Sequence, residues 1–387
     1  MRRSTRASPT FAWSWPRLAA SDSPPSRRPA VHATAGRLRV VASCQRYPAG
    51  VGATTVEQLI AIAEEARAAM RRGEDAAGVD QFERNYGPMR EALDNWLGAG
   101  RADDAFRLSA ALVPLWMATK RVDEGMAWLD AALGTGEGSD AARARGLHDH
   151  GYLAFFSGGY ELADRRFAES RQLADQIGNR DIAALALAGS ARVALNEDPA
   201  HSVRLLRQAV ELTQDLPESL GRSSAEHVLG VALQLSGDLQ GAGDVMRARL
   251  DAARAAGNEF VVFVESSNLS MVERKLGNLD RAEALSFEAL AIVTRNRDEM
   301  AIPWVINGLA AVIAAKGNHQ RAAILLAIAE SLLARAGGEW PADEREQYEG
   351  TLATVSAALP ASVLDDVRAT AATMTLDESV AAALDPA

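Results

Sequence analysis

The sequence predicts an all-α fold, an α-solenoid of antiparallel helix pairs with a period of about 40 residues. Three observations support this prediction. Aromatic residues make up only 5% of the 387 residues, a composition that disfavours β-sandwiches and β-barrels. Ala, Leu, Glu and Arg dominate from about residue 56 onward, and apolar residues recur there at helical spacing. Short turns that contain glycine recur at a fixed interval, as they do in repeat proteins.

Residues 1–55 are expected to be a disordered leader rich in proline and arginine. Six of the 14 prolines lie in the first 50 residues, and Ser23–Pro29 cannot form a helix because proline lacks an amide donor. Nine arginines and one acid, Asp22, give these 50 residues a net charge of +8. A basic tail could contact nucleic acid, but the composition favours a leader that does not fold or a misplaced start codon.

Residues 56–135 are expected to form the N-terminal helical segment of the array. Val56, Leu59 and Ala63 have the spacing of one apolar helix face. Turns are expected at Ala99–Arg101 and at Thr119–Val122, where the helical pattern is interrupted. This segment therefore contains several helices in a more divergent arrangement than the repeats that follow.

Residues 136–340 are expected to form the repeats, each of which is a helix, a tight turn and a second helix. The turns are marked by glycines at 158, 237, 277 and 317, and Asp198 fills the gap between the first two. Small residues recur seven positions before each turn and, with one exception, five positions after it. The first set is Gly151, Ala191, Gly230, Ser270 and Ala310, and the second is Ala163, Val203, Ala242, Ala282 and Ala322.

These small residues have a physical role in the predicted fold. Two helices approach to an axial separation of about 8–10 Å only where the side chains at their crossing are small. We therefore expect Gly230 to face Ala242 across the turn at Gly237. One pair alone leaves an apolar face uncovered, so neighbouring pairs must stack, and residues 341–387 are expected to form C-terminal capping helices. Phe260–Val264 could be taken for a strand, but the preceding Ala-Gly-Asn indicates a helix cap and a new helix.

The order of small residue, Gly-Asp or Gly-Asn turn, apolar residue and alanine resembles a tetratricopeptide repeat, lengthened from about 34 residues. Six further segments narrow the resemblance: Arg90–Leu97, Arg107–Leu112, Glu124–Leu133, Arg321–Leu332, Pro341–Tyr348 and Thr375–Leu384. With them, residues 56–384 are similar to the C-terminal helical-repeat region of large actinobacterial regulators of the LuxR, AfsR and MalT type.

Regulators of this type usually carry a signal-transduction NTPase module before the repeats, and many also carry a helix-turn-helix DNA-binding domain. The resemblance implies that this sequence is the sensor or partner-binding part of such a bacterial regulator, without its NTPase and its DNA-binding domain. It implies a tetratricopeptide-like fold and a part in signal transduction to transcription.

Composition excludes several classes of function. No lysine follows a glycine, since Lys120, Lys275 and Lys316 are the only lysines, so a standard P-loop is absent. The single cysteine, Cys44, excludes an internal disulfide and a cysteine-rich zinc site. Beyond residue 50 the net charge is −18, which disfavours direct binding of nucleic acid. No apolar run is long enough to span a membrane, and Pro16 follows the short N-terminal apolar run, so a cytoplasmic protein is expected.

Candidate chemistry is sparse. His148-Asp149-His150 is the densest cluster of histidine and acid. Histidines two positions apart on a helix point about 200° apart, so they do not readily share a metal ion. Adjacent carboxylates such as Glu64-Glu65 diverge in the same way and are typical of a solvated face. No catalytic site, no metal site and no cofactor is therefore expected.

The concave face is the better place for a binding site. In a tetratricopeptide-like solenoid the first helix of each pair lines the inner groove, and the resemblance assigns groove positions shortly before each turn. The assigned side chains are aromatic, amide and cationic, which suits an extended peptide or an anionic small ligand. The alternative is ordinary polar surface or packing within a repeat. These predicted groove residues are Arg145, His148, Tyr152, Phe155, Arg192, Asn196, His227, Gln234, Ser267, Arg274, Lys275, Trp304 and Asn307.

The leading functional hypothesis is a non-enzymatic regulatory module that binds a protein, a peptide or a small effector in this groove. Three alternatives come from other classes: a DNA-binding transcriptional regulator that acts through an unrecognised motif, an enzyme such as a nucleotide hydrolase, and a truncated remnant of a larger LuxR-type regulator. The sequence leaves a homo-oligomer open.

Deletion of residues 1–50 is expected to leave the melting temperature nearly unchanged, because this segment contributes no periodic apolar face and a solenoid is stabilised by contacts between neighbouring repeats. Thermal unfolding of the full and shortened chains, followed by circular dichroism, measures the difference. A drop of many degrees would show that the leader packs on the array.

Overall fold

The computed structural model describes residues 55–71, 75–195, 197–340 and 342–385. Within these ranges the chain forms seventeen α-helices and no strand, which confirms the all-α prediction. Residues 1–54 of the expected leader and Asn196 lie outside the described residues. Phe260–Val264 is helical, as its flanking residues indicated.

The helices follow one another with short connections. The N-terminal segment holds α1 (Val56–Arg71), α2 (Asp75–Gly98), α3 (Ala102–Ala118) and α4 (Val122–Gly134). Five pairs follow, and we call the first helix of each pair the A helix and the second the B helix. They are α5 (Asp140–Phe156) with α6 (Tyr160–Gln176), α7 (Arg180–Ala194) with α8 (Pro199–Thr213), α9 (Leu220–Leu235) with α10 (Leu239–Ala256), α11 (Glu259–Lys275) with α12 (Leu279–Arg295), and α13 (Ala301–Ala315) with α14 (His319–Arg335). The chain ends with α15 (Ala342–Ala358), α16 (Ala361–Thr373) and α17 (Leu376–Leu384).

The predicted turns lie between the A and B helices. Gly158, Gly237, Gly277 and Gly317 have φ of 81°, 87°, 84° and 85°. Glycine adopts this left-handed conformation without the steric cost that a Cβ adds, which explains the residue type at the turn. Asp198 replaces the glycine turn in the second pair by capping α8, because its side chain accepts a hydrogen bond from the amide of His201.

A second series of left-handed residues ends the B helices. Gly178, Gly257 and Gly337 have φ of 68°, 66° and 64°, and they are spaced by about two periods of the repeat. Arg297 takes the equivalent position after α12 with φ of 50°. Four of the five pairs therefore have a left-handed turn inside the pair and another after it, and the pair α7–α8 has neither among its described residues.

The two helices of a pair approach closely at the predicted small residues, all ten of which are buried. The hydroxyl of Ser270 on α11 donates to the carbonyl of Ala282 on α12 at 2.8 Å. A Cβ added at Gly230 would lie 3.0 Å from Cγ of Met246 on α10. The nearest side chain to Gly230 is thus one helical turn beyond Ala242, which corrects the expected contact, because the B helix presents its residue four positions later at the crossing.

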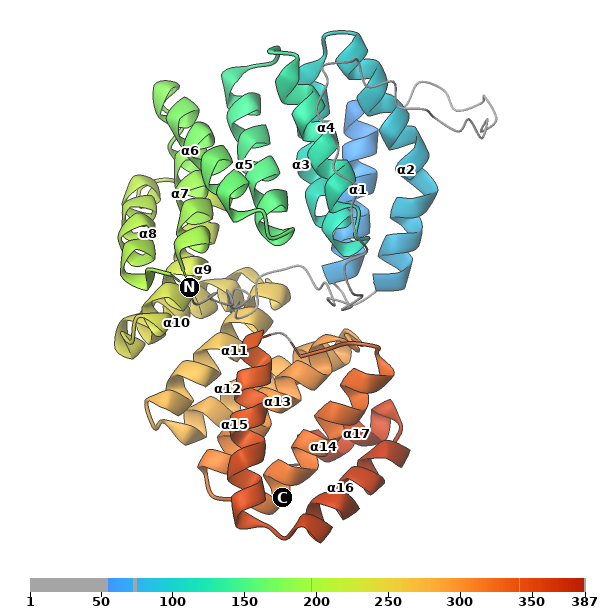
Figure 1. Cartoon of the computed structure of the whole chain (residues 1–387), viewed down its shortest axis with the longest axis vertical. Helices are drawn as coiled ribbons and strands as arrows, with labels where there is room; N and C mark the ends of the chain where they lie inside the picture. The colour runs from blue at the N-terminus through green and yellow to red at the C-terminus, as the bar shows by residue number, and fades with distance from the viewer. Residues whose placement is uncertain (1–54, 72–74, 196, 341, 386–387) are drawn as a thin grey trace, which may run out of the picture.

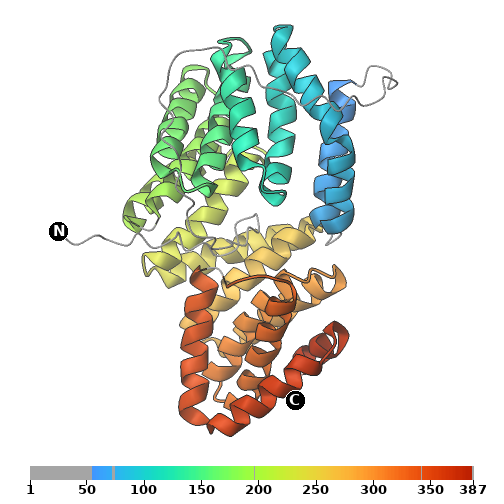
Figure 2. The ribbon, with the colours of Figure 1, turned by 45° about the vertical axis from the view of Figure 1, so that its right-hand side comes forward.

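The A helices form a row, and this row changes direction once. Adjacent A helices pack against each other from α5 to α7 and α9, and again from α11 to α13, with α15 next in line beside α13. The backbones of α9 and α11 do not pack in this way, and α10 connects them. Figures 1 and 2 show α1–α8 in the upper part of the molecule and α12–α17 in the lower part, with α9 and α10 between them.

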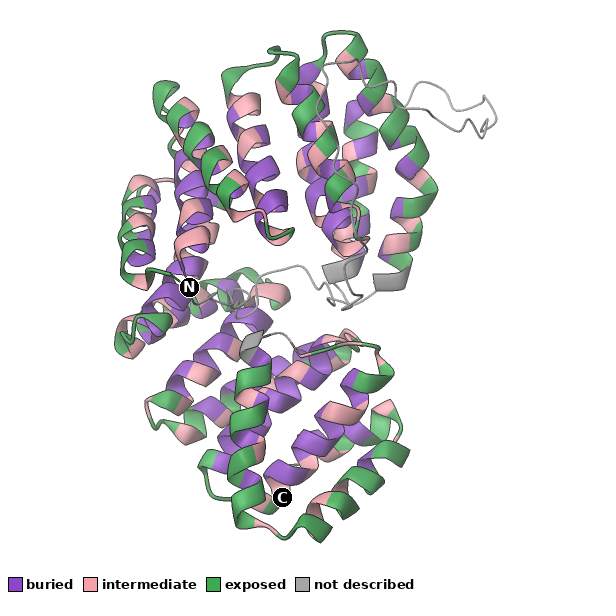
Figure 3. Ribbon diagram, in the orientation of Figure 1, coloured by how far each residue is buried: buried purple, intermediate pink, exposed green. Residues whose placement is uncertain are grey.

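Two large apolar clusters hold the array together. One joins α1 to α5 around Trp116 and Phe82, and the indole of Trp116 donates to the hydroxyl of Tyr86 at 2.9 Å. The other runs from α7 to α17 and includes Leu206, Leu269 and Leu325. Figure 3 shows that the buried residues face neighbouring helices, while exposed residues cover the outer faces of helices such as α6 and α16. None of the described helices is long and apolar enough to cross a membrane.

Replacement of Gly230 by leucine is expected to destabilise the fold by about 1–3 kcal/mol, because the added side chain collides with Met246 at the crossing. Gly230→Ala is expected to change the free energy of unfolding by less than about 1 kcal/mol, since the gain in helix propensity offsets a contact that Met246 can relieve. Chemical denaturation measures both variants.

Gln234→Leu provides the control on the same helix. The oxygen Oε1 of Gln234 is buried without a hydrogen-bond partner among the described residues, so leucine is expected to leave stability nearly unchanged. A Gly230→Leu variant as stable as wild type, together with an unstable Gln234→Leu variant, would show that the assigned crossing is wrong.

Candidate ligand-binding site

The described groove residues all lie on A helices, where the sequence placed them. They divide into a group on α5 and α7 and a group on α9, α11 and α13. Their part in ligand binding stays a prediction, and the contacts that each group makes decide which of them is available to a ligand.

The group on α5 and α7 is largely occupied by its own polar contacts. Nε of Arg145 donates to Asp149 at 2.8 Å, and Nδ1 of His148 lies 2.9 Å from the same carboxylate. The guanidinium of Arg192 lies 5.7 Å from the ring of Tyr152 and donates to the hydroxyl of Ser224 at 3.0 Å. Most of this group therefore stabilises the packing of the A helices.

Burial and charge set the ionisation of this network. Burial lowers the pKa of His148, although the neighbouring Asp149 acts in the opposite direction. Burial by itself would raise the pKa of Asp149, but Arg145 and His148 outweigh it, so the pKa of Asp149 lies below its ordinary value. His150 contacts a different carboxylate, with Nε2 3.2 Å from Asp130, so the two histidines do not converge. No cluster of three metal-ligating side chains occurs among the described residues.

A buried ion network joins α9, α10 and α11 at the place where the row of A helices changes direction. Glu265 on α11 is 1% exposed and accepts from Nε of Arg249 at 2.8 Å. Nδ1 of His227 on α9 lies 3.0 Å from the same oxygen of Glu265, and Arg249 also donates to Glu226 at 3.3 Å. The predicted groove residue His227 thus helps to set the position of α11 relative to α9.

Farther along α9 and α11 lies a cavity of about 480 Å³, which we call the A-helix cavity. It brings the predicted residues Gln234, Arg274 and Lys275 together with residues of α15. Its lining residues are Val231, Gln234, Leu235, Met271, Arg274, Lys275, Ala311, Ala314, Ala315, Glu346, Gln347, Gly350, Thr351 and Thr354. The A helices α9, α11 and α13 therefore contribute to one site together with α15, which continues their row and which we count with them as an A-type helix.

The residues from α15 were missed by the sequence analysis, although the period contains the signal that finds them. Gln347 lies 40 residues after Asn307, and Thr351 lies 40 residues after Ala311. Because α15 continues the row of A helices beside α13, the same register carries the lining onto α15. Treating residues 341–387 only as a cap hid this continuation.

Two adjacent cations distinguish the A-helix cavity. Neither Arg274 nor Lys275 forms an ion pair with a described residue. NH2 of Arg274 donates to Oε1 of Gln347 at 3.4 Å, and its Nε is buried without a partner in the described part of the chain. Burial lowers the pKa of Arg274. Burial and the charge of Arg274 lower the pKa of Lys275, and the charge of Glu346 acts in the opposite direction.

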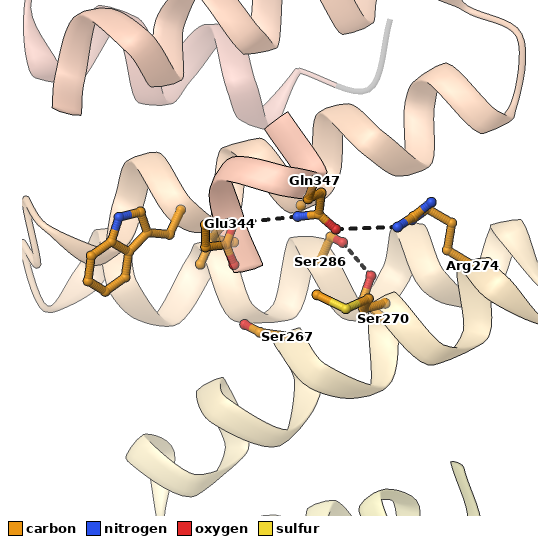
Figure 4. A pocket seen from close by; sticks show the side chains of 10 residues that line it. Ser267, Ser270, Arg274, Ser286, Glu344 and Gln347 are labelled. Atoms are coloured by element: carbon orange, nitrogen blue, oxygen red, sulfur yellow. Dashed lines mark hydrogen bonds between the residues drawn. The ribbon is translucent and has the colours of Figure 1, made fainter. Parts of the chain in front are cut away.

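A second, much smaller cavity of about 20 Å³ shares Arg274 in its lining and has room for about one water molecule. Figure 4 shows Gln347 between Glu344 and Arg274, and the hydroxyls of Ser270 and Ser286 joined at 2.7 Å. The predicted residues Ser267 and Trp304 also line this cavity. Asn307 is fully buried and donates to Glu344 at 2.7 Å, so these polar contacts fix α15 against α11 and α13.

Replacement of Arg249 by methionine is expected to cost about 3–5 kcal/mol, because Glu265 then stays buried with one of its two partners missing. Burial alone raises the pKa of Glu265, but His227 and Arg249 outweigh it, so the pKa lies below the ordinary value. The ionised form of Glu265 therefore stabilises the fold at pH values above the ordinary carboxyl pKa. This contribution is lost as the pH falls through the pKa of Glu265 in the folded state.

The stability gap between wild type and Arg249→Met is accordingly expected to narrow at acidic pH, as urea denaturation at several pH values will show. Arg249→Met combined with Glu265→Leu is expected to recover most of the loss. A gap that does not change with pH would assign the effect to packing rather than to charge.

Comparison with known proteins agrees with this architecture. The sequence matches no family model and no curated protein. Among solved structures, a Signal Transduction ATPase with Numerous Domains (STAND) protein with a tetratricopeptide repeat sensor, from Pyrococcus horikoshii, matches 82% of this chain at a TM-score of 0.50 and 12% identity. This chain covers 52% of that protein, about half of its length.

Two proteins crystallised in complexes are also similar. Rap protein complexed with Competence and Sporulation Factor matches with a TM-score of 0.49 and 15% identity, covering 81% of this chain and 86% of that one. NprR in complex with its cognate peptide NprX matches with a TM-score of 0.44 and 13% identity, covering 76% and 81%. At these identities the likeness concerns the fold, and this chain has a tetratricopeptide-like helical-repeat fold.

Proposed function

We propose that this protein is a non-enzymatic sensor that binds a peptide or a small effector on its A helices and serves as the sensor part of a transcriptional regulator. The observation that carries the proposal is the A-helix cavity, which four A-type helices line together. A ligand in this cavity contacts α9 and α15 at once, although the two helices are distant in sequence. Binding energy there acts on the relative position of several repeats.

The chemistry of the lining favours binding over catalysis. Its ionisable groups are two cations and the exposed carboxylate of Glu346. Acid–base catalysis requires a proton donor or acceptor with a pKa near the operating pH, usually a histidine or a carboxylate held in place by partners. Amide and hydroxyl groups from Gln234, Gln347 and Thr351 instead offer hydrogen bonds to a ligand.

The fold supports the sensor role by analogy. The STAND protein from Pyrococcus horikoshii carries a tetratricopeptide repeat sensor, and this chain shares the fold over 82% of its own length. The sequence resemblance to regulators of the LuxR, AfsR and MalT type points to the same kind of module. The link to transcription rests on that resemblance.

The test blocks the cavity and asks whether ligand binding is lost. Gly350 lies on α15 in the cavity lining, is exposed, and has no atom within 4 Å of an added Cβ, so Gly350→Trp is expected to fill the cavity without disturbing the fold. A panel of short peptides and small effectors is screened by thermal shift against the full chain. A ligand at a hundred times its Kd is expected to stabilise wild type by about 2.7 kcal/mol and to leave Gly350→Trp unaffected.

Gly134→Trp is the matched control, because Gly134 is an exposed helix-terminal glycine on α4 with equally open surroundings. The proposal requires that this variant keeps every ligand that wild type binds. Ligands that stabilise Gly350→Trp as well as wild type, or turnover of a screened compound, would contradict it.

A further inference from the structure

The A-helix cavity has an unbalanced charge. Arg274 and Lys275 are consecutive in the last turn of α11, and both line the cavity. Glu346 is the one acid in the lining, is exposed, and forms no ion pair with either cation. Two arginines on other A helices have a carboxylate one turn away, Arg145 with Asp149 and Arg222 with Glu226. The pair at 274 and 275 lacks this compensation.

The position of the cations at a helix end explains only part of this arrangement. The carboxyl end of α11 carries a partial negative charge, which favours a basic residue in its last turn. That field does not supply hydrogen-bond acceptors to the guanidinium, and Gln347 provides a single one at 3.4 Å. Arg274 is half-buried, and its buried Nε has no hydrogen-bond partner among the described residues. Arg274 therefore has donors left for an anionic group in the cavity.

The rest of the lining is apolar and made of small side chains. Val231, Met271, Ala311 and Ala314 contribute hydrocarbon surface, and Leu235 is one of three large apolar side chains that are exposed in the described part of the chain. A volume of about 480 Å³ lies in the range of sites for small molecules, about 300–1,000 Å³. Charge at one group and hydrocarbon elsewhere define the chemistry of a matching ligand.

We propose that the A-helix cavity binds a small amphiphilic organic anion, whose anionic group is held by Arg274 and Lys275 and whose hydrocarbon part packs on Val231, Leu235 and the alanines of α13. This inference rests on the proposed sensor function and selects a small effector over a peptide. A carboxylate or a phosphate group satisfies the cations in the same way, because both accept two hydrogen bonds from one guanidinium. The hydrocarbon part supplies affinity through burial of apolar surface.

Bound anion also changes the contacts of α15. Gln347 is the one described acceptor of Arg274, and its amide nitrogen lies 3.4 Å from Glu344. An anion that takes over the guanidinium donors releases Oε1 of Gln347. The ligand anion therefore replaces one long contact between the charged guanidinium and a neutral amide.

The experiment measures binding of defined probes to the full chain by isothermal titration calorimetry. The probes are octanoate and 3-phenylpropionate as amphiphilic carboxylates, octan-1-ol as a neutral analogue, octyl phosphate as an amphiphilic phosphate, and inorganic phosphate as an anion without hydrocarbon. At least one amphiphilic anion is expected to bind with a Kd below about 1 mM, and about tenfold or more tightly than octan-1-ol and inorganic phosphate.

Three variants test the residues. Arg274→Met and Lys275→Met are each expected to weaken the best anion by about tenfold or more, and Gly350→Trp to abolish its binding. Arg295→Met is the matched control, since it removes an equal charge from α12, where Arg295 pairs with Glu259 outside the cavity. It is expected to keep the wild-type Kd within about twofold. Lys275 is exposed, so Lys275→Met keeps the test valid if Arg274→Met does not fold.

The outcomes separate the inference from the proposed function. Equal binding of octan-1-ol and octanoate, unaffected by Arg274→Met and Lys275→Met, overturns the anion site. Inorganic phosphate binding as tightly as octyl phosphate overturns the amphiphilic part. Peptide binding that is lost in Gly350→Trp, with no binding of any anion probe, overturns the inference and leaves the sensor function standing. Failure of both peptides and anions to bind overturns both.

Discussion

The close approach of two antiparallel helices at small residues is the constraint on which the rest of this structure depends. At Gly230 there is just enough room for the side chain of Met246, and at Ser270 the hydroxyl reaches the carbonyl of Ala282. Side chains of ordinary size at these points would separate the helices of a pair and tilt the A helices out of their row. The left-handed turns then reverse the chain after helices of similar length. As a result, the A helices of successive pairs present the same face in the same direction.

The candidate site arises where this regularity is interrupted. The backbones of α9 and α11 pack less closely than those of α7 and α9, and the buried carboxylate of Glu265 with Arg249 and His227 joins the two helices. A polar network of this kind requires exact partners, because a buried charge without them is costly. It fixes the separation of the two helices beside the cavity and leaves space that side chains of α15 only partly fill.

Periodicity in the sequence was sufficient to predict most of the fold. The turns at Gly158, Gly237, Gly277 and Gly317 are local signals, and the small residues around them follow from the geometry of a hairpin. The site was harder to predict from the sequence, because it depends on contacts between residues about 40 positions apart. Nothing local to His227 shows that Glu265 lies beside it, and nothing local to Arg274 shows that its neighbour from α15 is an amide. The cluster of His148 and Asp149 was visible in the sequence, but their contact and their burial were not.

The scarcity of lysine bears on chemical labelling of the A-helix cavity. The chain has three lysines, and the ammonium of Lys316 is held by Asp280 and Glu283, which raise its pKa to about 12. Burial and the neighbouring Arg274 lower the pKa of Lys275. Acylating reagents attack the neutral amine, so at mildly alkaline pH the side chain of Lys275 is acylated faster than that of Lys316. A fluorophore attached to Lys275 lies in the lining of the A-helix cavity.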